Sequence, residues 1–328
     1  MNEASLFDLD PRSSELGSSV GLWALTQIPN VGSTTALRLA KTCSSWDQLA
    51  NDPQRALELS GSRRVSPHDL ASMADNPIEP PRPSGDTRLI GYFDFDFPSG
   101  LKEIKSPPAI LWVRGTVPEG NLAAVVGTRN PTKSGALITQ ETVSFLVAHD
   151  YGIVSGLAKG VDTFAHEQAL ISGGKTWAYL GSGVDVPSPA ENCDLAEQIV
   201  AAGGGLLSEV SLGERPSSHS LVARNRLQSG SSRFTVIAQS GIPSGTLHTA
   251  LFTLEQKRPL VVVIPPEKEL DNPVWAGNKA LLDPDGCDPK ILNAKGKLAE
   301  RIVQRRPVAD CTISKTSDLN QIIRTSHQ

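Results

Sequence analysis

Six short apolar runs, separated by stretches long enough for a helix, dominate the chain from residue 121 onward. They read NLAAVVGT, YGIVSG, KTWAYLGSG, GLLSEV, RFTVIAQ and PLVVVIPP. Runs that are apolar almost throughout are typical of strands covered on both faces, and their alternation with helices is typical of parallel sheets. The sequence therefore predicts an α/β fold built on a doubly wound, mostly parallel sheet.

The remainder of the chain divides by composition into further segments. The polar residues 1–19 are predicted to be disordered, and residues 20–75 to form a small helical domain with a PNVG turn between its first helices. Such a turn, as in a helix-hairpin-helix or SAM-like unit, either packs two helices together or holds a DNA backbone. A proline-rich linker at 76–88 then leads to the sheet domain at 89–290. Residues 291–328 are expected to form a short appendage or tail.

Charge and cysteine content limit the classes of function. Lys and Arg number 31 against 35 Asp and Glu, so the net charge is −4 and any phosphate site must be local. Four scattered cysteines without CxxC spacing predict neither a zinc site nor disulfides. No apolar run is long enough for a membrane span, and no signal peptide is evident. We therefore expect a cytoplasmic protein without metal, cofactor or membrane contact.

Small and polar residues gather where the predicted strands end. In doubly wound sheets, ligands bind beyond the carboxyl ends of the strands, so these residues are expected to share one rim. The first strand ends in Gly127, Thr128 and Arg129, and an arginine offers a planar fork of donors to phosphate. Other ends carry Ser155-Gly156, Gly181-Ser182-Gly183, Ser208-Glu209 and Gln239-Ser240.

The stretch SGLAKGVDTFAHEQAL joins a strand to a helix through a Gly-rich loop. Gly156 and Gly160 bracket the loop, and Lys159 stands where the helix begins, a place suited to an anion. Asp162 and His166 lie one turn apart on that helix. They form either a cap with its hydrogen-bond partner or an acid–base pair, and the lack of an accompanying nucleophile or metal ligand favours the cap.

Two further groups complete the predicted rim. After the fourth strand, Arg224 and Arg226 flank Asn225, a combination suited to a phosphate backbone and a base edge. Farther on, Ser244, Gly245 and Thr246 precede another helix, whose N-terminus can receive an anion.

The ordered series of motifs resembles the DNA-processing protein A family, also called Smf, over about residues 90–286. The motifs are GTRNPTKSG, SGLAKGVDTFAHEQAL, YLGSGVDVPSPAEN, LLSEVSLGERP, RNRLQSGSS, PSGTLHTALFTLEQ and PVWAGNKALL. The resemblance implies a Rossmann-like domain that binds single-stranded DNA without cutting it, forms a homodimer and helps to load a RecA-type recombinase. By position, it implies these DNA-binding residues: Gly127, Thr128, Arg129, Gly156, Lys159, Gly160, Asp162, Arg224, Asn225, Arg226, Ser244, Gly245 and Thr246.

The chain departs from the family pattern at several places. Leu221 and Val222 stand where members usually carry Phe-Pro, Gln239 replaces a glutamate, and Ser188-Pro189 replaces Tyr-Pro. These changes lead us to expect a specialised member, one that acts in phage or plasmid conflict. Two alternatives stay open: a nucleotide-sensing module, and a nucleoside monophosphate hydrolase. The related hydrolases need a carboxylate three residues after the threonine of their motif, where this chain has Thr249.

Overall fold

The computed structural model describes residues 15–43 and 45–326 and divides the chain into two compact units, Met1–Val113 and Arg114–Gln328. The five-segment division predicted from composition stays a prediction, and most of its N-terminal segment, residues 1–14, lies outside the described residues. The elements of the first unit are α1 (Ser19–Thr26), α2 (Ser33–Thr42), α3 (Trp46–Asn51), α4 (Pro53–Ser60), α5 (Pro67–Asp75), β1 (Thr87–Gly91), α6 (Ser99–Lys102) and β2 (Ile110–Gly115). Strand β2 runs across the boundary between the two units.

Short side-chain caps start most helices of the first unit. Ser18 accepts from the N–H of Gly21 at the start of α1, and Ser45 and Ser66 cap α3 and α5 in the same way. Such caps satisfy backbone donors that have no partner within the helix. The apolar side of the helices is buried, including Leu22 and Leu25 of α1. The first unit therefore has a helical core of its own.

The second unit is built on parallel strands. Its seven strands lie in the order β6-β5-β4-β3-β7-β8-β9, and every printed pair among them is parallel. The chain moves outward from β3 to β6, then returns to the other side of β3 and moves outward again to β9. The predicted α/β, Rossmann-like, doubly wound sheet is thus confirmed, with its switch point between β3 and β7. The strands are β3 (Asn121–Val126), β4 (Tyr151–Ser155), β5 (Thr176–Tyr179), β6 (Gly205–Ser208), β7 (Phe234–Ile237), β8 (Leu260–Val263) and β9 (Cys311–Ile313).

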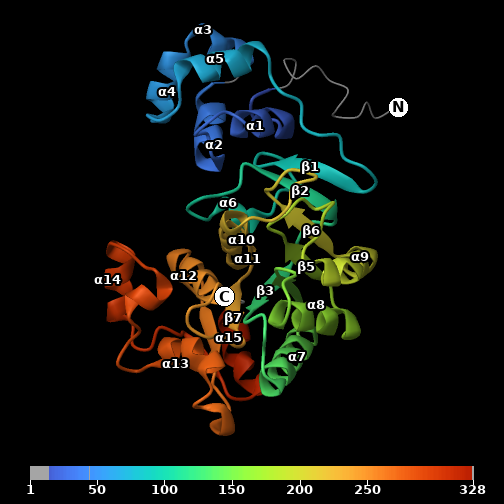
Figure 1. Cartoon of the computed structure of the whole chain (residues 1–328), viewed down its shortest axis with the longest axis vertical. Helices are drawn as coiled ribbons and strands as arrows, with labels where there is room; N and C mark the ends of the chain where they lie inside the picture. Colours follow the sequence, from blue (N-terminus) through green and yellow to red (C-terminus); the bar gives the residue numbers. More distant parts are fainter. Residues whose placement is uncertain (1–14, 44, 327–328) are drawn as a thin grey trace. The chain divides into compact units, whose positions relative to one another are not determined.

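Helices cover both faces of this sheet, as Figure 1 shows for α7 and α8 on one flank and α12 to α14 on the other. Val125 and Val236 face a core completed by α7, α8 and α15, whereas their neighbours Val126 and Ile237 face a core completed by α12, α13 and α14. This alternation follows from the period of two in a strand. The helices are α7 (Lys133–Val147), α8 (Val161–Ile171), α9 (Cys193–Ala201), α10 (Ser218–Ala223), α11 (Asn225–Ser231), α12 (Thr246–Glu255), α13 (Ala276–Leu282), α14 (Lys297–Gln304) and α15 (Leu319–Ser326), and the 3-10 turns are η2 (Ala190–Asn192), η3 (Glu267–Glu269), η4 (Pro273–Trp275), η5 (Pro289–Leu292) and η6 (Thr316–Asp318).

The segment after residue 290, expected as a short appendage, takes part in this core. Strand β9 pairs with β8, placing Cys311 opposite Val261 and Ile313 opposite Val263. Leu319 and Ile322 of α15 are buried in the same core as β3 and β4. Strand β9 is three residues long, which is too short to stand out as a periodic pattern in the sequence.

Within the described ranges, no helix has both the length and the apolar character needed to cross a membrane.

Candidate functional site

A pocket of about 370 Å³ lies beyond the carboxyl end of β3, at the switch point of the sheet. Its wall comes from four segments: the end of β3, the start of α8, the α10–α11 region and the start of α12. This is the place where doubly wound sheets hold ligands. The lining residues are Val126, Gly127, Thr128, Arg129, Ala158, Asp162, Leu221, Val222, Arg224, Asn225, Gln228, Pro243, Ser244, Gly245, Thr246 and Thr249.

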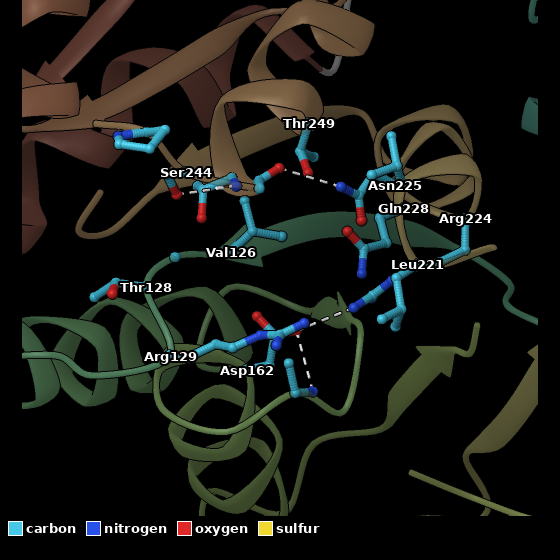
Figure 2. Close-up of a pocket in the computed structure, with 16 residues that line it drawn as sticks. Val126, Thr128, Arg129, Asp162, Leu221, Arg224, Asn225, Gln228, Ser244 and Thr249 are labelled. Carbon is cyan, nitrogen blue, oxygen red and sulfur yellow. Dashed lines mark hydrogen bonds and ion pairs between the residues drawn. The ribbon is translucent and has the colours of Figure 1, made fainter. Parts of the chain in front are cut away.

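Two guanidinium groups approach each other across this pocket. Figure 2 shows Arg129 and Arg224 extending toward its middle from opposite sides, with Ser244 on the side of α12. Arg129 is exposed and has no hydrogen-bond or ion-pair partner among the described residues, whereas Arg224 is only 7% exposed. One cation is therefore free to reorient toward a ligand, and the other is fixed in the wall.

Burial of Arg224 is balanced by several protein acceptors. Its Nη1 donates to the carbonyl of Tyr179 at 3.2 Å, and its Nη2 lies 3.8 Å from a carboxylate oxygen of Asp162. The amide oxygen of Gln228, in the orientation that satisfies its hydrogen bonds, accepts from the same guanidinium. Burial lowers the pKa of Arg224, and Asp162 opposes that shift. Nε of Arg224 has no partner within the described part of the chain.

Asp162 belongs to this buried arrangement. Burial raises the pKa of its carboxyl, while Arg224 and the N–H of Ala158 work in the opposite direction. The Ala158 N–H donates to Asp162 at 3.3 Å, as a loop-capping role requires. Asp162 thus stabilises both the loop and the arginine.

The amides of the Gly-rich loop are largely engaged within the protein. Leu157 donates to Nε2 of His166 at 3.4 Å, Ala158 donates to Asp162, and Gly156 donates to the Gln228 oxygen at 3.1 Å. We expected this loop to receive phosphate through its amides, but few of those amides are free to donate. Gly156 and Gly160 have steric reasons to be glycine instead. A Cβ on Gly156 would collide with the Arg224 guanidinium, and Gly160 has φ +78°.

Lys159 lies in an adjoining hollow of about 140 Å³, which it shares with Gly156, Arg129 and Arg224. Its Nζ forms an ion pair with Glu191 at 2.6 Å, and both side chains are more than half exposed. The hydrogen bond from Lys159 lowers the pKa of the Glu191 carboxyl. Lys159 is thus at the predicted rim, but its charge is compensated.

Asn225 and Arg226 have structural partners. The Asn225 amide donates to the carbonyl of Gly245 at 3.2 Å and so connects α11 to the loop before α12. Arg226 makes two hydrogen bonds, of 2.6 and 2.7 Å, to the carboxylate of Glu209, and it lines neither hollow. Side chains two positions apart in helical geometry point about 200° apart, so Arg224 and Arg226 cannot share one pocket.

His166 is buried as a neutral ring. Its Nδ1 lies 2.7 Å from Oγ1 of Thr176, and that hydroxyl donates to the carbonyl of Ile153 at 2.9 Å. With Nε2 accepting from Leu157, Nδ1 carries the proton. Burial lowers the pKa of His166 to about 3. Its partners are Leu157 and Thr176, so it is not the expected hydrogen-bond partner of Asp162. His166 does not line the pocket either.

Gln239, which is expected from the sequence to replace a glutamate, supports the start of α7. Its side-chain oxygen accepts from the N–H of Thr132 at 2.9 Å. The Thr132 hydroxyl donates to Glu269 at 2.7 Å, and the indole N–H of Trp275 donates to the same carboxylate at 2.8 Å. This part-buried network fixes the loop that follows Arg129.

The structure brings most of the predicted residues to one edge and separates a few from it. The pocket is lined by Gly127, Thr128, Arg129, Asp162, Arg224, Asn225, Ser244, Gly245 and Thr246, the neighbouring hollow is lined by Gly156 and Lys159, and Gly160 and Arg226 lie outside both. Sequence reasoning missed Gln228, although its i,i+4 spacing from Arg224 indicated proximity. Glu191, 32 positions after Lys159, gave no such signal.

Known proteins resemble this chain in sequence. A family model described as DNA recombination-mediator protein A matches residues 88–292. Protein Smf of Synechocystis sp. is 40% identical over 171 residues, which cover 50% of this chain and 43% of that protein. The DNA processing protein DprA of Streptococcus pneumoniae is 37% identical over 169 residues, which cover 51% of this chain and 59% of that protein. The chain thus matches about half the length of these relatives.

Two solved structures have the same fold. The X-ray structure of DNA processing protein A from Streptococcus pneumoniae has a TM-score of 0.68 at 24% identity, covering 93% of this chain and 97% of that one. That of Helicobacter pylori, reported for its mode of binding single-stranded DNA, has a TM-score of 0.57 at 24% identity, covering 73% and 96%. Since the family model spans more than half of the residues, the chain belongs to the DNA recombination-mediator protein A family.

Proposed function

We propose that the pocket at the switch point binds the phosphate backbone of single-stranded DNA. The observation that carries this proposal is the pair of guanidinium groups at one hollow, with Arg129 unpartnered among the described residues and Arg224 locked in the wall. Arginine donates in a planar fork that matches phosphate oxygens. Because the chain as a whole is acidic, binding depends on this local charge and weakens as salt rises.

The start of α12 supplements the two arginines. Ser244, Gly245 and Thr246 line the pocket, and α12 is ten residues long, so its positive dipole end favours an anion there. The hydroxyl of Ser244 accepts from the N–H of Thr246 at 3.2 Å and holds this turn in place. The pocket thus offers hydroxyls beside guanidinium groups.

Leu221 and Val222 affect how bases are held. Both line the pocket where family members usually carry Phe-Pro. An aromatic ring that stacks on a base contributes about 1–3 kcal/mol, and an aliphatic side chain offers only apolar contact. The proposal therefore places more of the affinity on the backbone than on the bases.

We propose that the chain is not an enzyme. Among the described residues that line the pocket, Asp162 alone carries a carboxylate, and that group is occupied by Arg224 and the loop. Thr249 lines the pocket at the position where the related hydrolases need an acid. In the described ranges, no cluster of His, Cys, Asp and Glu is arranged to hold a metal ion.

Membership of the family supports a role in DNA recombination and in the DNA uptake of transformation. We propose further that the protein acts in the cytoplasm as a homodimer and with a RecA-type recombinase. The four cysteines are free, in keeping with a reducing compartment. A specialised role in phage or plasmid conflict is proposed from the departures at Leu221, Val222 and Gln239.

Fluorescence anisotropy with a labelled single-stranded oligonucleotide tests the pocket. Arg129→Ala is expected to weaken binding and to reduce the slope of log affinity against log salt by about 0.7, the value for one lost phosphate contact on a single strand. The melting temperature should not change, because Arg129 has no partner in the described part of the protein.

Lys175→Ala is the matched control. Lys175 is half exposed at the amino end of β5, the edge opposite the pocket, and its ion pair with Glu119 lies on the surface. Equal binding by Arg129→Ala and the unmodified protein would overturn the proposal. A panel of mononucleotides in the same assay distinguishes a DNA-binding protein from a nucleotide sensor. The pocket of a sensor would bind mononucleotides and would not bind the oligonucleotide.

A further inference from the structure

A dense group of cations occupies residues 290–306, almost entirely beyond the family match that ends at residue 292. The segment has a net charge of about +5, although the complete chain has −4. One carboxylate, Glu300, accompanies the six cations, which are Lys290, Lys295, Lys297, Arg301, Arg305 and Arg306. The pocket described above does not account for this concentration of charge.

Four of these cations form neither an ion pair nor a side-chain hydrogen bond with any described residue, whereas Arg306 donates to the carbonyl of Val303. Lys290, Lys295, Lys297 and Arg301 are exposed, and no described residue forms an ion pair with any of them. The charges at Lys159 and Arg226, by contrast, are matched by Glu191 and Glu209, and Arg305 pairs with Asp310.

The arrangement on α14 is not one that stabilises a helix. Lys297 and Arg301 are four positions apart and so lie on the same side of α14, where like charges cost a few tenths of a kcal/mol. Lys297 also stands at the first position of the helix, where a cation opposes the dipole. The stability of α14 therefore does not explain Lys297 and Arg301.

The segment is fixed to the element that lines the pocket. Ile302 of α14 and Leu292 of η5 are buried in one core with Leu247 and Ala250 of α12, whose first residues line the pocket. Figure 1 shows α14 beside α12 within the second unit. The cations are thus held on a firm support beside the helix whose first residues line the pocket.

We propose that Lys290, Lys295, Lys297 and Arg301 form a second surface for the sugar-phosphate backbone of single-stranded DNA, here named the α14 basic surface. The identity of the ligand rests on the proposed function of the pocket. The contacts are independent of sequence, because they reach phosphates and no base edges. The surface extends the length of strand that one protomer holds.

The test uses the full chain carrying Lys297→Gln and Arg301→Gln together. Anisotropy is measured at several salt concentrations with single strands of about 5 and about 30 nucleotides, the first near the lower end of the usual range of single-strand site sizes and the second above it. For the long strand, the slope of log affinity against log salt should fall by about 1.4, or about 0.7 per cation. The short strand, held by the pocket, should bind as before.

Two controls separate this surface from general charge and from the pocket. Lys175→Gln with Lys268→Gln removes two exposed cations elsewhere on the second unit and should leave both slopes unchanged. Arg129→Ala should weaken the binding of both strands. Equal melting temperatures confirm that the variants fold, since the changed side chains are exposed.

Each outcome decides between the two proposals. An unchanged slope for the long strand in the α14 variant, or an equal change in the control pair, overturns the α14 basic surface and leaves the pocket standing. A loss in the α14 variant together with normal binding by Arg129→Ala overturns the pocket and keeps the surface. Binding of the surface to vesicles containing phosphatidylglycerol, with unchanged DNA binding, would also overturn it, and failure of the unmodified chain to bind DNA overturns both.

Discussion

Arg224 and Arg226 stand two positions apart in the sequence and have different environments. Arg224 is buried against Asp162 and the carbonyl of Tyr179, whereas Arg226 is held by Glu209 outside the pocket. Truncating a buried, paired guanidinium leaves its carboxylate uncompensated, so stability and binding would change together. Arg129, which is exposed, is therefore the residue whose substitution reports on ligand binding alone.

His166 gives the protein a dependence of stability on pH. Its pKa is about 3 in the folded protein and near 6.5 when unfolded. Below pH 6.5 the unfolded state therefore binds a proton that the native state does not, and stability falls by about 1.4 kcal/mol per pH unit down to about pH 3. Between pH 7 and pH 5, this residue should remove about 2 kcal/mol.

His166→Gln should remove that part of the pH dependence. Glutamine has both a donor and an acceptor, so it can replace some of the bonds to Thr176 and Leu157 while it does not titrate. The variant should be less stable at pH 7, with a deficit that shrinks by about 2 kcal/mol at pH 5. Urea unfolding at several pH values measures this, and parallel curves for the two proteins would contradict it.

The connection from β4 to α8 shows how one element constrains the site. Val161 donates to the carbonyl of Thr128 at 3.1 Å, so the first residue of α8 is attached to the end of β3. Gly160 permits this approach, because its backbone has φ +78° and packs directly on the carbonyls of Thr128 and Arg129. The position of Arg129 therefore depends on a glycine in a different loop.

Gly160→Ala should destabilise the protein and weaken DNA binding together. A Cβ at this position would lie 2.5 Å from the carbonyl oxygens of Thr128 and Arg129. Gly173→Ala is the matched control, since Gly173 also has positive φ, +72°, but has no atom within 4 Å of the added Cβ. We expect Gly160→Ala to cost about 1–3 kcal/mol more in urea unfolding. Equal costs would show that the packing of Gly160 on these carbonyls does not matter.

At the scale of the whole molecule, the described residues after 290 contribute to the core of the second unit. Cys311 and Ile313 of β9 and Leu319 and Ile322 of α15 are buried with residues of β3, β4 and β7. The sequence indicated only an appendage there, because its apolar residues occur in short pairs. Those pairs are buried because they pack against strands that come much earlier in the sequence.

Leu319→Ala should therefore destabilise the second unit by about 2–5 kcal/mol, the usual cost of removing a fully buried leucine side chain. Val303→Ala, which truncates a side chain that is 46% exposed on α14, should cost less than about 0.5 kcal/mol. Thermal and urea unfolding of both variants provide the measurement. Similar stabilities for the two would mean that α15 is a detachable tail.

The alternation of strands and helices, and the edge at which the polar strand ends meet, could be predicted from the sequence alone. This was possible because burial in strands and helices follows a short period, and because the carboxyl ends of parallel strands share one edge. Arg129 and the turn at Ser244 were predictable on this basis. Which charges are compensated could not be predicted in this way, since Lys159 meets Glu191 and Arg226 meets Glu209 through the packing of separate elements. Ion pairing depends on distances across the fold, and no local period in the sequence encodes those distances.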